Sequence, residues 1–411
     1  MKIVRIIARL NVGGPARHVV WLTQALEDSE FQSALIAGTV PPGEDDMSYF
    51  AKSANVGPIY LREMSRELSP RDTIAVFKLY KRLREAKPDI VHTHTAKAGA
   101  VGRTAAFLYR WLTLGVFIGR PRRLRVVHTY HGHIFHSYYG ALKTWVFLTI
   151  ERLLARATDE IIVLSDQQLD EINSKFGVGR TEQFRVVPLG IDIGPYTPSG
   201  ELREAFRDEI GAAENDVVVG FVGRLTEIKN VSLLLNVADT FRNETGLKFV
   251  IIGDGNRREA LESQAHSLDL RNVVFLGNRV DIANLYNGLD IVALTSLNEG
   301  TPLSIIEAMA AGRPVISTAV GGVPGLLGDP SESSAGFTVC ERGIRVETFE
   351  SSDYADGLNY LIKNGRLRAK MGGKGAQYVR SNYSKERLVE DIKALYRDLT
   401  SRNFRSIPHT K

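Results

Sequence analysis

Short runs of apolar, often β-branched residues alternate along the chain with longer segments in which apolar residues recur every three or four positions. The short runs are typical of buried strands, and the longer segments are typical of helices that cover a sheet. Their alternation predicts the α/β class, with parallel, doubly wound sheets. The strands predicted in the first half are Ile3–Ala8, Ser33–Ala37, Ile59–Leu61, Ile90–His94, Arg125–Thr129, Glu160–Leu164 and Arg185–Val187.

A second series of strands and helices follows the stretch Pro188–Gly200, which is rich in proline and glycine and shows no period. We therefore expect one domain over residues 1–190, a second over 191–382, and a terminal helix with a polar tail over 383–411 that returns to the first domain. The strands predicted in the second series are Val217–Val222, Phe249–Ile252, Val273–Leu276, Ile291–Thr295 and Val315–Thr318. Two such domains predict a cleft at the carboxyl ends of their strands.

Composition narrows the class of protein. With 411 residues, 44% hydrophobic and 24% charged, the chain is typical of a soluble globular protein of two domains. The single cysteine, Cys340, excludes a disulfide framework and a multi-cysteine metal site. No stretch reaches 18 apolar residues, and the first apolar run enters a glycine loop without a signal-peptide cleavage site. We expect a cytoplasmic protein that does not bind nucleic acid.

The excess of positive charge lies in the first half of the chain. Its densest cluster directly follows the apolar and aromatic run Phe107–Ile118 and consists of Arg120, Arg122, Arg123 and Arg125. An apolar patch beside such a cluster fits an anionic membrane surface, so the segment Phe107–Arg125 predicts peripheral attachment to the inner face of the cell membrane. The alternative is a helix packed in the core, followed by a solvated arginine loop. The sequence leaves both open.

The stretch from Asp290 to Thr318 predicts a strand, a helix and a second strand. Thr301 is a plausible N-cap with Pro302 at the first helical position, while Gly312 and Pro314 end the helix. The free N–H groups at the start of this helix predict an anion site at residues 300–304.

Two carboxylates belong to that helix and to the loop that precedes it. Glu307 is the only charge in an otherwise apolar helix and needs a partner, because burying a lone carboxylate is costly. Glu299 stands in the preceding loop, with seven residues between the two.

Three other loops carry features suited to phosphate. Gly13 and Gly14 follow the first strand, and two glycines allow the backbone to approach a ligand closely. Arg224 and Lys229 leave the end of the Val217–Val222 strand, where both could reach one phosphate. Gly253, after the next strand, lies in a turn that lacks the third glycine of a dinucleotide fingerprint.

Histidines gather after two strands of the first domain. His94 ends one strand, and four more lie between residues 128 and 136, among them His131 and His133. The spacing of these four matches no common zinc motif and no cysteine or acidic residue accompanies them, so we expect no metal site.

The chain resembles the family 4 glycosyltransferases of the GT-B type, which are retaining, metal-independent enzymes built from two Rossmann-like domains that face each other across a cleft. The resemblance spans nearly the whole chain. Four stretches carry the resemblance: the Glu299 to Glu307 element, the Gly223-Arg224 to Lys229 loop, the junction Val187–Asp192, and the histidine-containing sequences around His94 and His131. The sequence around these histidines is similar to that of family members that act on lipid-linked acceptors in bacterial polysaccharide assembly.

The resemblance implies a role for each matching residue. Glu307 would hold the ribose, Arg224 and Lys229 the diphosphate, and Arg279 would lie near the nucleobase. Glu299 with the backbone of Gly300, Thr301, Pro302 and Leu303 would orient the donor, with Gly13, Gly14 and Gly253 also lining it. His131 would sit near the anomeric centre. The acceptor would contact His94, Lys97, Tyr130 and His133.

The implied function is transfer of a sugar from a nucleotide-diphosphate sugar, which we expect to be a UDP-sugar, to a hydroxyl of a lipid-linked glycan, without a cofactor. Departure and attack on one face, or a covalent intermediate on Glu299, would both retain configuration, and the sequence leaves both open. A UDP-sugar 2-epimerase of the same architecture and a non-catalytic sugar-nucleotide-binding protein are the alternatives.

Overall fold

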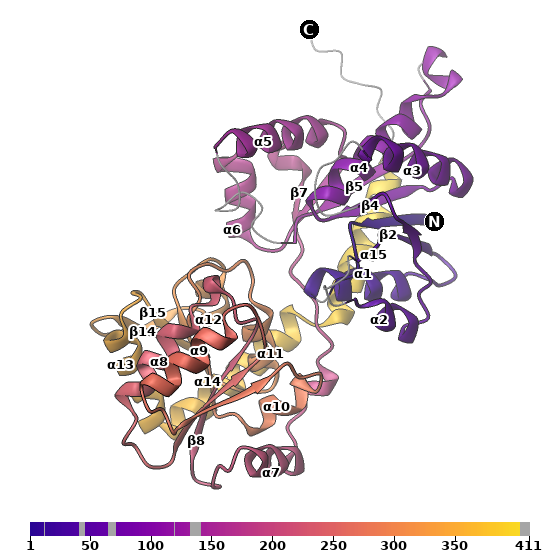
Figure 1. Ribbon diagram of the computed structural model, residues 1–411. Coiled ribbons are helices and arrows are strands. Elements are labelled where there is room, and N and C mark those ends of the chain that lie inside the picture. Colours follow the sequence, from indigo (N-terminus) through magenta and orange to yellow (C-terminus); the bar gives the residue numbers. More distant parts are fainter. Residues whose placement is uncertain (12, 41–45, 65–70, 119, 132–140, 403–411) are drawn as a thin grey trace. The chain divides into compact units, whose positions relative to one another are not determined.

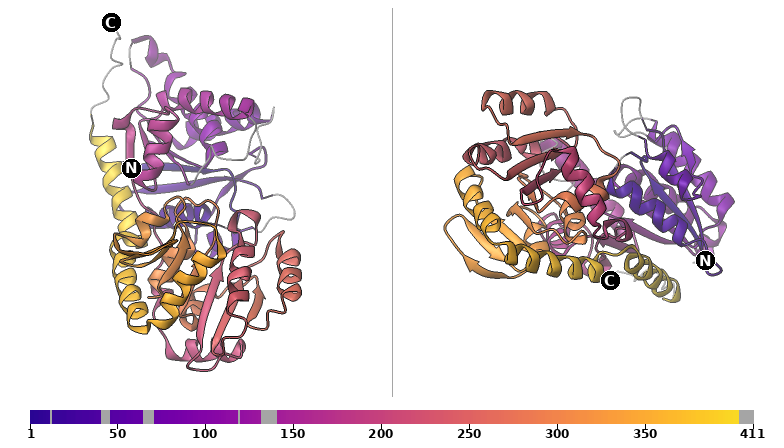
Figure 2. Two further views of the ribbon diagram at one scale, coloured as in Figure 1. Left: turned by 90° about the vertical axis from the view of Figure 1, so that its left-hand side faces the viewer. Right: turned by 90° about the horizontal axis from the view of Figure 1, so that it is seen from below.

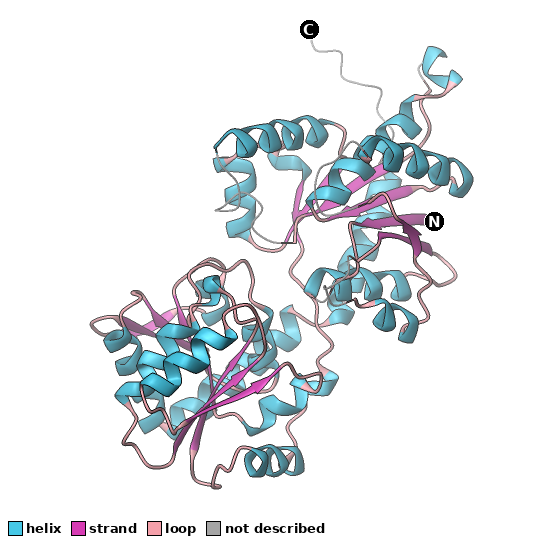
Figure 3. Ribbon diagram, in the orientation of Figure 1, coloured by secondary structure: helices cyan, strands magenta, loops and turns pink. Residues whose placement is uncertain are grey.

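The computed structural model describes the chain except residues 12, 41–45, 65–70, 119, 132–140 and 403–411 (Figure 1). The chain forms two compact units, Met1–Gly190 with Lys385–Lys411, and Ile191–Ser384. We call them unit 1 and unit 2. The first division falls at the expected position, and the second lies two residues beyond the expected one. In each unit, helices flank a central sheet (Figure 3).

Unit 1 is built on a seven-stranded parallel sheet in the order β3-β2-β1-β4-β5-β6-β7. Strands β4, β5 and β6 are buried along their whole length, as expected where helices cover both faces of a parallel sheet. Its strands are β1 (Lys2–Ile7), β2 (Gln32–Gly38), β3 (Ile59–Leu61), β4 (Ile90–His94), β5 (Arg125–Thr129), β6 (Glu160–Val163) and β7 (Phe184–Val186).

The helices of unit 1 connect these strands. The segment Phe107–Arg125 is not one helix, because α4 ends at Trp111 and a separate 3₁₀ turn follows at Leu114–Ile118. The α-helices are α1 (Gly14–Ala25), α2 (Ser48–Ser53), α3 (Asp72–Ala86), α4 (Ala96–Trp111), α5 (Ala141–Arg156) and α6 (Asp166–Leu169). A π turn at Asp170–Lys175 and a 3₁₀ turn at Thr181–Gln183 complete them.

The last helix, α15 (Lys385–Ser401), belongs to unit 1, although the whole of unit 2 separates it in sequence from the rest of that unit. Its apolar face, including Leu388, Ile392 and Tyr396, shares a buried cluster with Ile3 of β1 and Ile90 of β4. The views in Figures 1 and 2 both show this yellow helix beside the strands of unit 1. Burial of that face explains why the helix returns to unit 1.

Unit 2 contains an eight-stranded sheet in the order β10-β9-β8-β11-β12-β15-β14-β13. The sheet is parallel, as predicted, from β10 to β15, and at its other edge β14 pairs antiparallel with both β13 and β15. Only two residues join β14 to β15, and so short a connection requires antiparallel strands. The strands are β8 (Val217–Val222), β9 (Leu247–Ile252), β10 (Val273–Gly277), β11 (Ile291–Leu294), β12 (Val315–Thr318), β13 (Pro330–Ser333), β14 (Phe337–Cys340) and β15 (Gly343–Val346).

The helices of unit 2 include the one expected at the anion site. It begins one residue later than predicted: Pro302, in an extended conformation, is the N-cap residue in place of Thr301. The α-helices are α7 (Gly200–Glu209), α8 (Val231–Thr240), α9 (Arg258–Ser267), α10 (Ile282–Gly288), α11 (Leu303–Ala310), α12 (Val323–Leu327), α13 (Ser351–Lys363) and α14 (Gly365–Asn382). Short 3₁₀ turns lie at Gly194–Tyr196 and Glu227–Lys229. Within the described residues, no helix has the length and apolar character needed to cross a membrane.

Candidate functional site

The strand order of unit 2 reverses between β8 and β11, and a parallel sheet offers a ligand crevice at such a point. The loop after β8 contains Arg224 and Lys229, and the loop after β11 contains Glu299. Three predicted donor-binding side chains therefore follow the two strands that border the reversal. This placement could not be read from spacing alone, because it depends on which strands are neighbours.

An ion pair joins these two loops. The Nζ atom of Lys229 donates to Oε1 of Glu299 at 2.5 Å, and the Ser296 hydroxyl donates to the same oxygen at 2.6 Å. The two charged side chains are only 21% and 11% exposed, so water screens the pair less than it would on an open surface. The carboxylate thus has two donors on one oxygen, and the ammonium is held at a defined place.

Backbone contacts fix the same two loops to each other. The amide of Leu297 donates to the carbonyl of Ile228 at 2.8 Å, and the Thr295 hydroxyl donates to the carbonyl of Lys229 at 3.0 Å. The position of Lys229 therefore depends on the backbone as well as on its own ion pair.

Arg224 and Arg279 have different surroundings. The side chain of Arg224 is exposed and has no hydrogen bond or ion pair with the residues that the structure describes. Arg279 is held by two carboxylates, with Nε donating to Asp281 at 2.8 Å and Nη1 donating to Glu209 at 2.5 Å. These partners raise the pKa of Arg279. Arg224 is thus available to a ligand, whereas the guanidinium of Arg279 already has acidic partners, and its role near a nucleobase stays a prediction.

A pair of glycines after β12 supports the loop that carries Glu299. Gly321 has a φ of +55°, and a Cβ atom there would lie 1.6 Å from the carbonyl oxygen of Glu299. The amide of Gly322 donates to the carbonyl of Gly300 at 2.8 Å. Only glycine permits so close an approach. The sequence analysis did not identify these residues, although the Gly-Gly pair after a predicted strand was a signal that could have found them.

The partner that Glu307 requires is on α10. The hydroxyl of Tyr286 lies within hydrogen-bond distance of two acceptors, Oε2 of Glu307 at 3.3 Å and the carbonyl of Ser304 at 3.2 Å, and Glu307 is 9% exposed. Burial, followed by the neighbouring Glu307 charge, raises the pKa of Tyr286 well above its ordinary value. Glu307 lies on the helix that follows Glu299, so both carboxylates belong to the same strand-loop-helix segment.

Gly253 has a structural role. Its φ is +136°, and a Cβ atom there would lie 1.9 Å from the carbonyl oxygen of Gly223. Close packing of the two loops accounts for this glycine without a ligand, so its contact with the donor stays a prediction.

In unit 1 the strand order reverses between β1 and β4. Gly13 precedes α1 and Gly14 is its first residue, so both lie beside this point, and His94 ends β4. Nδ1 of His94 lies 2.9 Å from Nε2 of His131, which follows β5. Burial lowers the pKa of His131 to about 3, and both burial and nearby histidines lower that of His94. Both imidazoles are therefore neutral at pH 7, so one of them can donate a hydrogen bond to the other.

Behind them lies a buried polar group that the sequence analysis did not find. Nδ1 of His92 lies 2.6 Å from the hydroxyl of Tyr396 on α15, and Nε2 lies 2.7 Å from the Thr129 hydroxyl. The ring of His92 stacks on that of His94, with 4.1 Å between centroids. Tyr396 is more than 300 residues away in sequence, so no local pattern could have indicated this contact.

Tyr130, Lys97 and His133 are the other three residues predicted to contact the acceptor. The side chain of Tyr130 is completely buried, and its hydroxyl donates to Glu151 at 2.5 Å, beside the Arg103–Glu151 ion pair, so its contact with the acceptor stays a prediction. Lys97 is 7% exposed and forms an ion pair with Asp72. His133 lies outside the described residues.

Comparison with known proteins identifies the family. A model described as "Glycosyltransferase Family 4" matches residues 12–194, and one described as "Glycosyl transferases group 1" matches residues 203–378. The chain is 34% identical over 262 residues to UDP-Gal:alpha-D-GlcNAc-diphosphoundecaprenol alpha-1,3-galactosyltransferase of Escherichia coli. That match covers 61% of this chain and 63% of the relative, so it spans less than two thirds of the relative's length.

Two further comparisons extend over more of the chain. The D-inositol 3-phosphate glycosyltransferase of Actinosynnema mirum is 29% identical over 342 residues, which cover 79% of this chain and 76% of that protein. The crystal structure of Anabaena HepE in complex with UDP shares the fold with a TM-score of 0.75 and 22% identity, over 97% of this chain and 100% of that chain. None of these relatives favours the epimerase alternative. The chain therefore belongs to glycosyltransferase family 4 and has the two-domain GT-B fold.

Proposed function

We propose that this protein transfers a sugar from a UDP-sugar to a hydroxyl group of a lipid-linked glycan. The observation that carries the proposal is the Lys229–Glu299 ion pair with the exposed Arg224 nearby in sequence, all at the strand-order reversal of unit 2. The structures named for HepE with UDP and with UDP-glucose support a uridine donor. The galactosyltransferase of E. coli, whose name includes a diphosphoundecaprenol, supports a lipid-linked acceptor.

In this proposal the cations of unit 2 bind the diphosphate of the donor. Arg224 and Lys229 stabilise the negative charge that grows on the leaving UDP, and such electrostatic stabilisation is usually the largest contribution to catalysis. The backbone from Gly300 to Leu303 offers N–H groups to the same phosphates, and Glu307 accepts hydrogen bonds from the ribose. The assignment of Gly13 and Gly14 to the diphosphate stays a prediction.

We propose that the reaction retains configuration by departure and attack on one face of the sugar. The bond between the anomeric carbon and the phosphate oxygen breaks, the acceptor oxygen bonds to that carbon, and the departing phosphate takes the acceptor's proton. Glu299 is less suited to be a covalent nucleophile, because Lys229 and Ser296 both donate to one of its oxygens. Its role is to position Lys229 and the donor sugar.

The acceptor side of the proposal rests on unit 1. His131 and His94 are neutral hydrogen-bonding groups at the carboxyl ends of the strands, suited to hydroxyl groups of a sugar. The 3₁₀ turn after α4 presents Leu114, Phe117 and Ile118, which are 85%, 87% and 71% exposed. We propose that this turn rests on an anionic membrane that holds the lipid-linked acceptor.

A transfer assay tests the proposed function. The purified full chain is incubated with a UDP-sugar panel (galactose, glucose and N-acetylglucosamine) and a lipid-diphosphate-linked N-acetylglucosamine, and the product is identified by mass. We expect one donor to give a new glycoside, and Arg224→Ala to lower kcat/KM by roughly 10²-fold to 10³-fold. Arg271→Ala is the matched control, because Arg271 is an 88% exposed arginine of unit 2 whose partner is a neighbouring surface aspartate.

Equal rates for Arg224→Ala and Arg271→Ala would remove Arg224 from the proposed site. Turnover of the UDP-sugar to an epimer, with no acceptor present, would instead support the epimerase alternative.

A further inference from the structure

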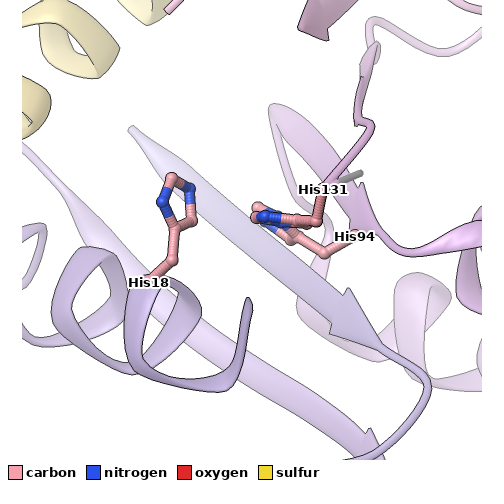
Figure 4. Close-up of side chains that lie close together, drawn as sticks. All are labelled: His18, His94 and His131. Carbon is pink, nitrogen blue, oxygen red and sulfur yellow. The ribbon is translucent and has the colours of Figure 1, made fainter. Parts of the chain in front are cut away.

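Three histidines from three elements of unit 1 converge at one place. His18 lies on α1, His94 ends β4, and His131 follows β5. One ring nitrogen of each lies within 4.8 Å of the others. Figure 4 shows the ring of His18 facing those of His94 and His131, which lie over one another. The sequence indicated His94 and His131 but not His18, because only the pairing of β1, β4 and β5 brings the three elements together.

The ring nitrogens of this group have few partners. Both nitrogens of His18, Nε2 of His94 and Nδ1 of His131 are buried and make no hydrogen bond with any described residue. A buried polar atom without a partner destabilises the folded chain, so such an atom is a candidate for binding a ligand. His18 is 3% exposed and contacts the other two rings edge-on, at 4.9 Å from His131 and 5.7 Å from His94 between centroids.

The chemistry of the group suits a particular class of ion. A neutral imidazole offers one lone pair, and three imidazoles are a donor set for Zn²⁺ and for Co²⁺, Ni²⁺ or Cu²⁺, whereas Mg²⁺ and Ca²⁺ prefer oxygen. Zinc binds imidazole nitrogen at about 2.0–2.1 Å, which brings the ligand atoms of a tetrahedral site to about 3.4 Å from one another. The rings must therefore rotate inward to close on an ion.

We propose that His18, His94 and His131 form a three-histidine site for a zinc-class transition-metal ion, with the fourth position left to water. The site is proposed from the convergence of the three rings and from His18, both of whose buried nitrogens lack a hydrogen-bond partner among the described residues. It does not depend on the proposed transfer reaction. A bound ion would occupy lone pairs of His94 and His131 that the proposed function gives to the acceptor and the donor sugar.

Calorimetric titration of ZnCl₂ into the untagged full chain, with no donor present, tests the site. We expect one ion per chain with a dissociation constant in the micromolar range or tighter, and Co²⁺ bound at the same site should show the intense visible absorption of tetrahedral cobalt. His18→Phe keeps an aromatic ring and removes the unpaired nitrogens, so it should bind Zn²⁺ at least 10-fold more weakly while its melting temperature without metal stays equal or rises.

Two control variants make the outcome specific. His266→Ala removes an exposed histidine of unit 2 and should leave zinc binding unchanged. The double variant His133→Ala/His136→Ala removes the two histidines that follow His131 in sequence and should also bind as the wild type does. The proposal is overturned if the wild type binds no Zn²⁺, if His18→Phe binds it with unchanged affinity, or if binding is lost only in the double variant. Each of these results leaves the transfer assay unaffected, so the two proposals fail separately.

Discussion

At the scale of single residues, Glu307 is the side chain whose proposed role can be separated most cleanly from its structural one. We predict that Glu307→Gln weakens UDP binding by about 10-fold to 100-fold, because a hydrogen bond to a charged group contributes about 1.5–3 kcal/mol. The amide can still accept from Tyr286, so the free energy of unfolding should change little. Calorimetric titration of UDP and urea unfolding of the same preparation measure the two effects.

The comparison variant is Tyr286→Phe, which removes the hydroxyl that donates to Glu307. We expect it to lower the free energy of unfolding by about 1 kcal/mol and to affect UDP binding less than Glu307→Gln does. The opposite pattern, with a large loss of stability in Glu307→Gln and unchanged UDP affinity, would make Glu307 a structural residue only.

At the scale of elements, the carboxyl ends of the strands of unit 1 concentrate neutral histidines. These histidines are His18, His92, His94, His128 and His131. Burial is the main cause of the lowered pKa of each. The unfolded chain takes up protons on these side chains below about pH 6.5, whereas the folded chain does not until far lower pH. The contribution of these histidines to the free energy of unfolding of unit 1 should therefore be complete above about pH 6.5. It should decrease as the pH falls below that value.

The expected slope is about 1.4 kcal/mol per pH unit for each such histidine. Glu160, whose pKa burial raises, acts in the opposite sense, but it is one carboxyl against five imidazoles. All three tryptophans of the chain, Trp21, Trp111 and Trp145, belong to unit 1, so urea unfolding followed by tryptophan fluorescence reports on this unit. Equal midpoints at pH 7.5 and pH 5.5 would contradict the assignment of these histidines as neutral.

Elements were the level at which sequence reasoning succeeded best. The strand at Val217–Val222 was predicted to the residue, because a strand buried on both faces is a continuous apolar run. The strands at Ile90–His94 and Arg125–Thr129 were also predicted to the residue, although both contain polar residues. The strand Pro330–Ser333 at the antiparallel edge of unit 2 was missed, because it is polar and exposed along its length. The strands Phe337–Cys340 and Gly343–Val346 were missed although most of their residues are buried, since each is only four residues long. Contacts such as Tyr286 with Glu307, or Tyr396 with His92, arise only when the packing of distant segments is known.

At the scale of the whole molecule, the open question is where the protein works. Of the four predicted arginines, Arg120 and Arg123 are exposed, whereas Arg122 donates to the carbonyls of Tyr109 and Leu112 and Arg125 binds Asp159. The basic patch is therefore smaller than the sequence indicated. It still adjoins the exposed apolar turn of Leu114 and Phe117.

We predict that the protein sediments with vesicles containing phosphatidylglycerol and less with vesicles of phosphatidylcholine alone, and that salt weakens the association. The double variant Leu114→Ser/Phe117→Ser should lower the partition coefficient by about 10-fold or more, since each buried apolar side chain contributes about 1.5–3 kcal/mol. Phe349→Ser, at a 48% exposed phenylalanine of unit 2, serves as the control and should bind normally. Equal binding by all three proteins would place the membrane contact elsewhere or remove it.

The central claim is that the strand-order reversal of unit 2 binds the diphosphate of a uridine nucleotide through Arg224 and Lys229. Its most direct test is calorimetric titration of UDP into the wild type, Arg224→Ala and Arg271→Ala. We predict equal dissociation constants for the wild type and Arg271→Ala, and a value at least about 10-fold larger for Arg224→Ala. A wild type that does not bind UDP, or an Arg224→Ala variant that binds it equally well, would contradict the account.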